Sequence, residues 1–299
     1  MNGVLVIDKP AGPTSFDVVR RVKASLHLKR AGHTGTLDPI ATGVLPICLE
    51  EATKVAGFIS ESGKEYEAII RLGQETDTQD SCGKITAEGQ VPPLSNTLLE
   101  AALTKFRGEI QQVPPMYSAL KHEGKRLYEL AREGKEVERE PRRVVVHRLS
   151  LRDFSSNELR ISLRCSKGFF VRALAQDLGR ELGCGAHLKS LRRTASGPFT
   201  ERMALKLERL IELSKSDAGR EEIARALVSM SDALGELPAV SVGQSEASRV
   251  ARGLPFATDA APGRIRILSP SGDLLAVAEV DAEHRLRYLR VMASLKTQC

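Results

Sequence analysis

The sequence predicts a mixed α/β or α+β fold, a sheet flanked by helices, followed by a small β-rich module. Three observations predict it. Stretches with the two-residue period of strands and the 3.6-residue period of helices interleave, but not as a regular βαβ series. The sequence contains no phosphate-loop or dinucleotide-binding glycine motif, which disfavours a Rossmann fold. After residue 237, short apolar runs with turn residues replace helical patterns.

The N-terminal part alternates short apolar runs with polar, glycine-rich segments. Thr14 follows a proline-rich loop and has the features of a helix N-cap, with Asp17 three residues later in a variant of the capping box. Glycines and small polar residues dominate 30–43, which predicts a long shaped loop. The predicted elements here are a strand at 3–8, a helix at 15–28, a strand at 44–49 and a helix at 51–60.

The central part begins with a clear strand pattern. Tyr66, Ala68, Ile70 and Leu72 alternate with mostly polar neighbours, as in a half-buried strand. Residues 121–143 carry eight basic and six acidic side chains, which favours a solvent-exposed helical insertion. The other predicted elements are a helix near 95–107, strands at 144–146 and 159–165, and a helix from about 169 to 182.

The C-terminal part changes character at Leu237-Pro238. Residues 212–236 are rich in Ser, Ala and Glu, and we expect them to be helical. Strands are predicted at 263–268 and 274–280, with turn residues between them. The sequence therefore divides into a domain at 1–236 and a small β-rich domain at 237–299.

Composition excludes several classes of protein. Hydrophobic residues make up 41% and charged residues 27%, as in globular proteins, so extensive disorder is excluded. The uncharged stretch from Pro39 to Leu49 has 11 residues, whereas a membrane-spanning helix needs about 20 apolar residues. The N-terminus lacks the basic start of a secretory signal. We expect a cytoplasmic protein with no membrane segment.

Cysteine and histidine usage argues against disulfides and metals. The five cysteines are odd in number and form no C-x-x-C pair: Cys48, Cys82, Cys165, Cys184 and Cys299. This pattern indicates a reducing compartment rather than a disulfide framework or a zinc site. His33 has no second ligand-type residue at metal-binding spacing, so we predict no metal.

Charge favours an anionic partner. The net charge of +6 is weak evidence by itself. Residues 160–209, however, carry 11 basic and four acidic side chains, a net +7 that exceeds the excess of the whole chain. A polyanion such as RNA would be attracted most strongly there. A solvated basic face is the alternative interpretation.

The loop around Asp38 is the first candidate site. It places one carboxylate among glycines and hydroxyls, and Pro39 restricts Asp38 to an extended conformation. A rigidly held carboxylate suits a nucleophile or a base. The alternative is an ordinary Asp-Pro turn, in which the side chain bonds its own backbone. His33, in the same loop, is either a residue that packs on something flat or a turn residue.

Arg172 and Tyr66 are further candidates. Arg172 follows Gly168 and two phenylalanines at the start of a predicted helix, and a buried arginine there would need a carboxylate partner, for which Asp38 is one candidate. A surface arginine is the alternative. Tyr66 is one of four tyrosines, and a half-buried core aromatic is its alternative interpretation.

Five segments, in order along residues 3–210, resemble one family. They are LVIDKPAGPTSFDVVRRV (5–22), GHTGTLDPIATGVLPICLEEATK (32–54), KEYEAIIRLGQETDTQDSCG (64–83), PPMYSALKHEGKRLYELAREG (114–134) and CSKGFFVRALAQDLGRELGCGAHLKSLRRTASGPF (165–199). Together they resemble the motifs of the TruB family, the bacterial tRNA pseudouridine-55 synthases. Residues 237–299 resemble, more loosely, the family's small PUA-type RNA-binding domain.

The resemblance implies an isomerase that detaches a T-loop uridine of tRNA from its ribose at N1 and reattaches it through C5. It implies a pseudouridine-synthase fold with a mostly antiparallel mixed sheet, and no cofactor. Asp38 matches the catalytic aspartate, which attacks either the ribose C1′ or the uracil ring; a glycal route is a third option. Arg172 matches the arginine that pairs with it, and Tyr66 the tyrosine that stacks on the target base.

The resemblance also implies a set of RNA contacts. His33 matches the histidine that takes the place of the flipped base, and Leu191 an apolar residue of the base pocket. Lys54, Asp80, Lys167 and Phe170 fall among the substrate-binding positions. Phe170 departs from the family, which often has Tyr there, so a phenolic hydrogen bond is lost. An insertion at about 117–143 corresponds to the family's RNA-gripping segment.

We expect the protein to bind tRNA. We also expect it to be a monomer that needs no protein partner. Three alternatives remain open from the sequence. One is an enzyme of the same fold that acts on another RNA, as the guide-RNA-dependent dyskerin-like relatives do. Another is an RNA-folding chaperone, a role that is also compatible with catalysis. The last is a basic RNA-binding protein without chemistry.

Overall fold

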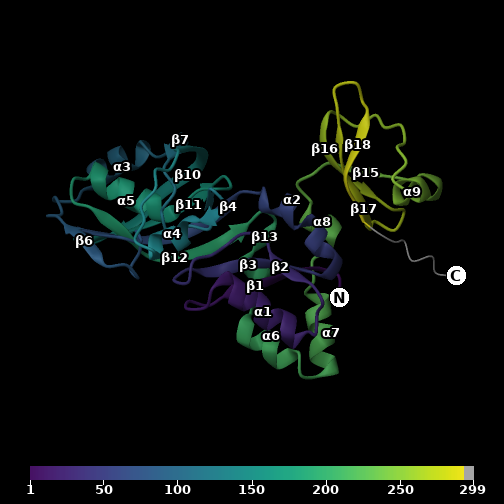
Figure 1. Ribbon diagram of the computed structural model, residues 1–299, viewed down its shortest axis with the longest axis horizontal. Helices are drawn as coiled ribbons and strands as arrows, with labels where there is room; N and C mark the ends of the chain where they lie inside the picture. The colour runs from purple at the N-terminus through teal and green to yellow at the C-terminus, as the bar shows by residue number, and fades with distance from the viewer. Residues whose placement is uncertain (293–299) are drawn as a thin grey trace. The chain divides into compact units, whose positions relative to one another are not determined.

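The computed structural model describes residues 1–292 (Figure 1). Residues 293–299 of the predicted C-terminal domain, Cys299 included, lie outside the described part. Contacts divide the chain into two compact units. Unit 1 comprises 1–38, 43–61 and the chain from Ser196 onwards, and unit 2 comprises 39–42 and 62–195. The chain therefore passes from one unit to the other at the Asp38–Pro39 bond.

Unit 1 contains the two N-terminal strands that the sequence predicted. Strands β1 (Gly3–Lys9) and β3 (Thr42–Leu49) pair antiparallel, from Gly3 opposite Leu49 to Lys9 opposite Gly43. Their side chains are almost all buried, as expected for continuous apolar runs. The short β2 (Ala31–His33) pairs with β3, and β14 (Leu205–Lys206) runs parallel to β1. Strand β13 (Phe199–Thr200) and the 3₁₀ helix η2 (Glu201–Met203) precede β14.

The N-terminal helices begin where the sequence predicted, but two differ in detail. Helix α1 (Ser15–Ser25) has the capping box of Thr14 and Asp17. It ends earlier than predicted, because His27 adopts a left-handed conformation with φ of 50°. The predicted helix at 51–60 is a 3₁₀ helix, η1 (Glu50–Val55), that continues into α2 (Ala56–Ser60).

The region predicted to be helical at 212–236 is helical for the most part, but it is broken into separate helices. Three short helices occupy this region: α6 (Leu207–Leu213), α7 (Asp217–Arg225) and α8 (Met230–Ala233). The serines that made the segment appear helix-compatible instead start new helices. The Ser216 hydroxyl accepts from the backbone N–H of Gly219, and that of Ser229 accepts from Asp232. Helix α6 lies beside α1 (Figure 1).

The C-terminal strands form a sheet of their own. Its order is β15 (Ala239–Ser241), β16 (Gly263–Leu268), β17 (Leu274–Val280) and β18 (Leu286–Val291). The two strands predicted at 263–268 and 274–280 are confirmed. Helix α9 (Gln244–Ala251), which was not predicted, buries Ala247 and Val250 in the same small core as Ile265 and Ile267.

Unit 2 contains a run of five neighbouring strands. Its strand order is β12 (Ala186–Ser196), β4 (Lys64–Leu72), β11 (Glu158–Cys165), β10 (Arg142–Phe154) and β7 (Gly108–Gln112). The alternation predicted for β4 is confirmed, with Tyr66 on its buried face. Strand β12 was missed because three cations interrupt its apolar residues and its burial does not alternate. A hairpin of β5 (Gln74–Thr76) and β6 (Ile85–Glu88) follows β4.

Two helices cover the sheet of unit 2. Helix α5 (Val171–Glu181) packs on β4, and α3 (Asn96–Thr104) packs on β10 and on α5. The predicted helical insertion is only partly helical: it has a hairpin of β8 (Lys121–His122) and β9 (Lys125–Arg126), then α4 (Leu127–Arg132). Charge density alone does not distinguish a hairpin from a helix. No helix among the described residues is both long and apolar enough to cross a membrane.

Candidate active site

The Asp38 loop is held by a serine that the sequence analysis did not single out. Ser15, the first residue of α1, is 1% exposed. Its hydroxyl accepts from the backbone N–H of Leu37 (2.8 Å) and donates to the carbonyl of Leu37 (3.0 Å). Leu37 is itself buried. The residue directly before Asp38 is therefore fixed through both of its backbone polar groups.

The other end of the loop is fixed by strand pairing. His33 lies opposite Ile47 in the β2–β3 pair, and the backbone N–H of Thr34 donates to the carbonyl of Pro46 (3.1 Å). Asp38 and His33 are both half-buried. The loop is thus anchored at two points before Asp38, at residues 33–34 and at Leu37, a preorganised arrangement rather than a free surface turn.

Lys54 lies in η1 of the same unit. Its ammonium pairs with Glu51 at 2.5 Å, and Arg30 pairs with the same carboxylate. These two hydrogen bonds keep the pKa of Glu51 below its ordinary value. In this structure Lys54 therefore belongs to an ion-pair network of unit 1.

Arg172 is buried in unit 2, so the interpretation as a surface arginine is wrong. Its side chain is 4% exposed. One terminal nitrogen, Nη1, donates to the carbonyl of Thr78 (3.0 Å), and the other, Nη2, donates to the carbonyl of Tyr117 (2.8 Å). Because the guanidinium is planar and both of its terminal nitrogens donate to carbonyls, its orientation is fixed.

Asp80 lies within ion-pair distance of this guanidinium. Its Oδ2 is 3.9 Å from Nε of Arg172. Its Oδ1 accepts from the Thr78 hydroxyl (2.7 Å) and from the backbone N–H of Cys82 (3.0 Å). Asp80 is 6% exposed, and so the structure gives this predicted substrate-binding residue a set of internal partners.

Tyr66 and Leu191 lie on strands of unit 2. Tyr66, on β4, is opposite Leu163 of β11 and is 9% exposed. Leu191, on β12, is 7% exposed, and its carbonyl is 3.5 Å from the Thr42 hydroxyl. The segment 39–42 that follows Asp38 thus reaches β12 of unit 2.

The connection from β11 to α5 carries Lys167 and Phe170. Lys167 is exposed and Phe170 is half-buried. Phe170 is the N-cap of α5, yet its side chain makes no capping hydrogen bond. Gln112, at the end of β7, bonds both backbone polar groups of Phe170 instead. No sequence signal indicated this contact, which joins residues 58 positions apart.

The basic segment 160–209 is not a single phosphate-binding face. Arg172 and Arg193 are buried, so neither is presented on the surface. Lys189 pairs with Glu158 and Arg180 with Glu75. The surplus of positive charge that the sequence predicted is therefore partly structural.

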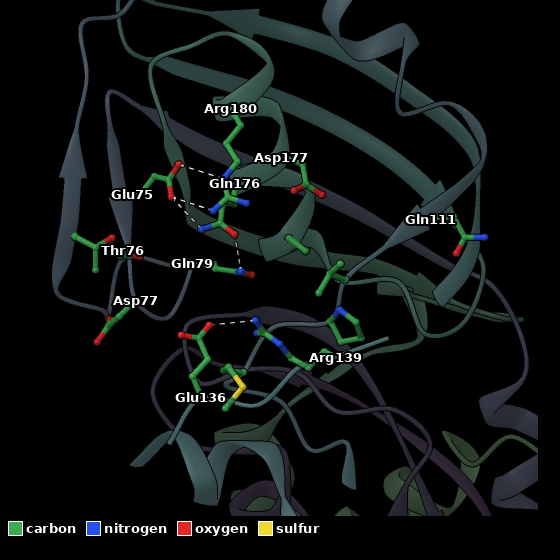
Figure 2. Close-up of a pocket in the computed structure, with 15 residues that line it drawn as sticks. Glu75, Thr76, Asp77, Gln79, Gln111, Glu136, Arg139, Gln176, Asp177 and Arg180 are labelled. Atoms are coloured by element: carbon green, nitrogen blue, oxygen red, sulfur yellow. Dashed lines mark hydrogen bonds and ion pairs between the residues drawn. The ribbon is translucent and has the colours of Figure 1, made fainter. Parts of the chain in front are cut away.

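A polar cavity of about 630 Å³ lies beside α5 (Figure 2). Figure 2 shows Glu75 facing Gln176 and Arg180, with Glu136 and Arg139 paired across the cavity from Gln79. Burial raises the pKa of Asp177, which lines this cavity; Arg180 lowers it and Glu75 raises it further. None of the nine predicted site residues lines the cavity.

The described residues contain no group of three or more His, Cys, Asp or Glu side chains that could hold a metal ion. The predicted catalytic residues themselves offer a carboxylate, a guanidinium and a phenol: Asp38, Arg172 and Tyr66. Such a set suits nucleophilic and proton-transfer steps.

Comparison with known proteins defines the class of this protein. Residues 23–171 match the family model described as TruB family pseudouridylate synthase (N terminal domain), and residues 172–235 match the tRNA pseudouridylate synthase B C-terminal domain. The fold resembles that of a chain in the crystal structure of a Cbf5-Nop10-Gar1 complex, with a TM-score of 0.78 and 28% identity, over 97% of this chain and 84% of that chain. The fold and the family models define a pseudouridine synthase, an isomerase.

Relatives of known name narrow the class to one family. The tRNA pseudouridine synthase B of Pseudomonas fluorescens is 40% identical over 296 residues, 98% of this chain and 96% of the relative. That of Escherichia coli is 42% identical over 98% of this chain and 95% of the relative, and that of Geobacter sulfurreducens is 49% identical over 85% and 83%. The chain belongs to the TruB family.

Proposed function

We propose that this chain converts the T-loop uridine at position 55 of tRNA to pseudouridine. The bond between N1 of the uracil and C1′ of the ribose breaks, and a bond between C5 and C1′ forms. The proton on C5 is lost to solvent and N1 gains one, so no oxidant, reductant or cofactor is needed. The observation that carries the proposal is the 40–49% identity to enzymes named tRNA pseudouridine synthase B over most of the chain.

We assign the nucleophile to Asp38. Its support is physical as well as comparative: Leu37 is held by the Ser15 hydroxyl and Pro39 fixes the next φ angle. A carboxylate on such a loop does not need to be ordered during the reaction. Attack at C1′, attack on the uracil ring and a glycal route all begin with this group.

We assign to Arg172 the positive charge of the catalytic set and to Tyr66 the ring that stacks on the target base. The fixed fork of Arg172 supports the first role, and the position of Tyr66 on a buried strand face supports the second. Leu191 and Phe170 would contribute apolar surface to the same base. Stacking of an aromatic ring on a base contributes about 1–3 kcal/mol.

The target base must leave its stack, which costs a few kcal/mol. We propose that His33 fills the place it leaves, and that Lys54, Asp80 and Lys167 contribute to RNA binding. Lys167 is exposed on the loop before α5, as a phosphate contact requires. Binding through such contacts should weaken as salt increases, because each neutralised phosphate releases counterions.

We propose that the RNA-gripping insertion spans about 117–143 and that residues 237–299 form a PUA-like RNA-binding domain after a catalytic domain at 1–236. The insertion has a small core of Met116, Leu127 and Leu130, and the C-terminal strands have a sheet and core of their own. We further propose that the chain acts in the cytoplasm as a monomer, with tRNA and without an obligatory protein partner.

Release of tritium tests the function. Purified protein is mixed, without added cofactor, with a tRNA transcript labelled at C5 of its uridines. We expect release of one label per tRNA, and no release from a matched transcript in which the T-loop uridine is replaced by cytidine. Absence of tritium release from the first transcript would overturn the assignment as a pseudouridine synthase. Equal release from both transcripts would show that the modified uridine is not the one in the T-loop.

A further inference from the structure

Gln112 is a buried amide at a junction of three segments. It is the last residue of β7 and is 2% exposed, whereas its neighbour Gln111 is exposed. A buried amide is costly unless its donor and acceptor are both paired. Its contacts therefore show what the position is used for.

Both ends of the Gln112 amide bind one backbone position. Nε2 donates to the carbonyl of Phe170 (3.0 Å), and Oε1 accepts from the N–H of Phe170 (2.8 Å). Phe170 is the N-cap of α5, and its carbonyl also accepts from Leu174 in the first turn. Since phenylalanine has no side-chain cap to offer, the Gln112 amide supplies the polar contacts that fix the start of the helix.

The start of α5 determines the direction of Arg172. This residue comes two positions after Phe170, and its guanidinium donates to Thr78 and Tyr117. Tyr117 belongs to the segment that continues from Gln112 through Pro114 and Pro115, both buried and with restricted φ. The segment 112–117 thus contacts α5 at two points, Phe170 and Arg172, with a stiff connection between them.

We propose that Gln112 is a positioning residue that acts through Arg172. By clamping the N-cap of α5 it keeps the guanidinium in the direction that the reaction requires. It thereby ties the root of the insertion at 117–143 to the first turn of α5. This inference rests on the proposed function, because it assigns Arg172 a part in turnover.

Two variants separate positioning from mere packing. Gln112→Met keeps the length and volume of the side chain but removes both hydrogen bonds. Gln112→Glu keeps an acceptor for the Phe170 N–H; when ionised it cannot donate to the carbonyl, and when protonated it can. Burial favours the protonated form. The control is Gln111→Glu, on the exposed face of the same strand.

For Gln112→Met we expect a loss of single-turnover rate of about tenfold or more, with the tRNA dissociation constant within about threefold of wild type. For Gln112→Glu we expect the activity relative to wild type to recover as pH falls from 8 to 5.5, because the protonated side chain can again donate to the Phe170 carbonyl. For Gln111→Glu we expect the activity relative to wild type to stay constant over the same pH range. In Arg172→Lys, adding Gln112→Met should cause little further loss, because the two residues act as one unit.

Three results would overturn the inference. The first is an unchanged turnover rate in folded Gln112→Met. The second is an activity of Gln112→Glu, relative to wild type, that does not depend on pH. The third is a double variant of Arg172→Lys and Gln112→Met in which the two single-variant losses of rate multiply. Failure of the proposed function is distinguishable, because in that case wild type itself releases no tritium. Should Gln112→Met fail to fold, the pH profile of Gln112→Glu decides alone.

Discussion

The Asp38 loop and the start of α5 are both rigid, but they are held in different ways. Asp38 is fixed through its neighbours: Ser15 bonds Leu37, and strand pairing holds the other end of the loop. Arg172 is fixed through its own side chain, which bonds two carbonyls from distant segments. The contacts that position Asp38 are therefore backbone contacts of the residues before it in the same loop. An arginine held by its guanidinium makes that group part of the structure of unit 2.

The buried partners of the Arg172 guanidinium predict that this residue contributes strongly to stability. Arg172→Met should lower the free energy of unfolding by about 3–5 kcal/mol, because it leaves Asp80 and two carbonyls without a buried cation. Turnover should be lost as well. Urea denaturation of wild type and variant measures the effect.

The control is Arg71→Met on β4, whose arginine pairs with Glu158 at 3.0 Å near the surface. A partly exposed ion pair contributes about 0–1 kcal/mol. Equal losses in the free energy of unfolding for Arg172→Met and Arg71→Met would contradict this prediction, because the buried partners of Arg172 would then contribute no more than a partly exposed ion pair.

Ser15→Ala tests the other half of the comparison. Removing a buried hydroxyl with two partners should cost about 1–3 kcal/mol of stability. Because Leu37 is released, Asp38 loses its fixed direction, and we expect the single-turnover rate to fall about tenfold. The tRNA dissociation constant should stay the same, since Ser15 is buried away from solvent.

The matched control for Ser15 is its neighbour Thr14. Thr14→Ala removes the helix cap and should cost about 1 kcal/mol without changing turnover. Equal turnover in the Ser15 and Thr14 variants would mean that the serine supports α1 only and does not position the loop.

The smallest effect on stability is expected for Asp177, which lies on α5 and lines the polar cavity. Burial raises the pKa of Asp177 in the folded state above its value in the unfolded chain. As pH rises, the carboxyl therefore loses its proton more readily in the unfolded chain. The free energy of unfolding of the wild type falls until pH exceeds the folded-state pKa. Asp177→Asn removes this loss. Its melting temperature should exceed that of wild type at pH 8 and match it near pH 4, with turnover unchanged. A higher melting temperature at both pH values would contradict a pKa origin.

Local patterns predicted much of this fold. The capping box of α1, the apolar runs of β1 and β3 and the alternation of β4 depend on residues close in sequence. Strand β12 escaped because its cations are placed by tertiary contacts, as the burial of Arg193 shows. The break between α6 and α7 escaped because Ser216 is equally compatible with a helix interior and with a cap.

The candidate site was named from sequence, but its supports were not. Motif resemblance picked out Asp38, Tyr66 and Arg172, whereas residue types alone left each with an ordinary structural interpretation. Ser15 and Gln112 were missed, because the contacts that reveal them span 22 and 58 positions. Nothing in a single sequence marks one buried glutamine as a clamp and its neighbour as a surface residue.

The most direct test of the account is Asp38→Asn, measured for turnover, tRNA binding and stability together. We predict a loss of single-turnover tritium release of at least about a thousandfold, with tRNA affinity and melting temperature close to wild type. A variant that still turns over at a rate near that of wild type would show that Asp38 is not the nucleophile and would contradict the account.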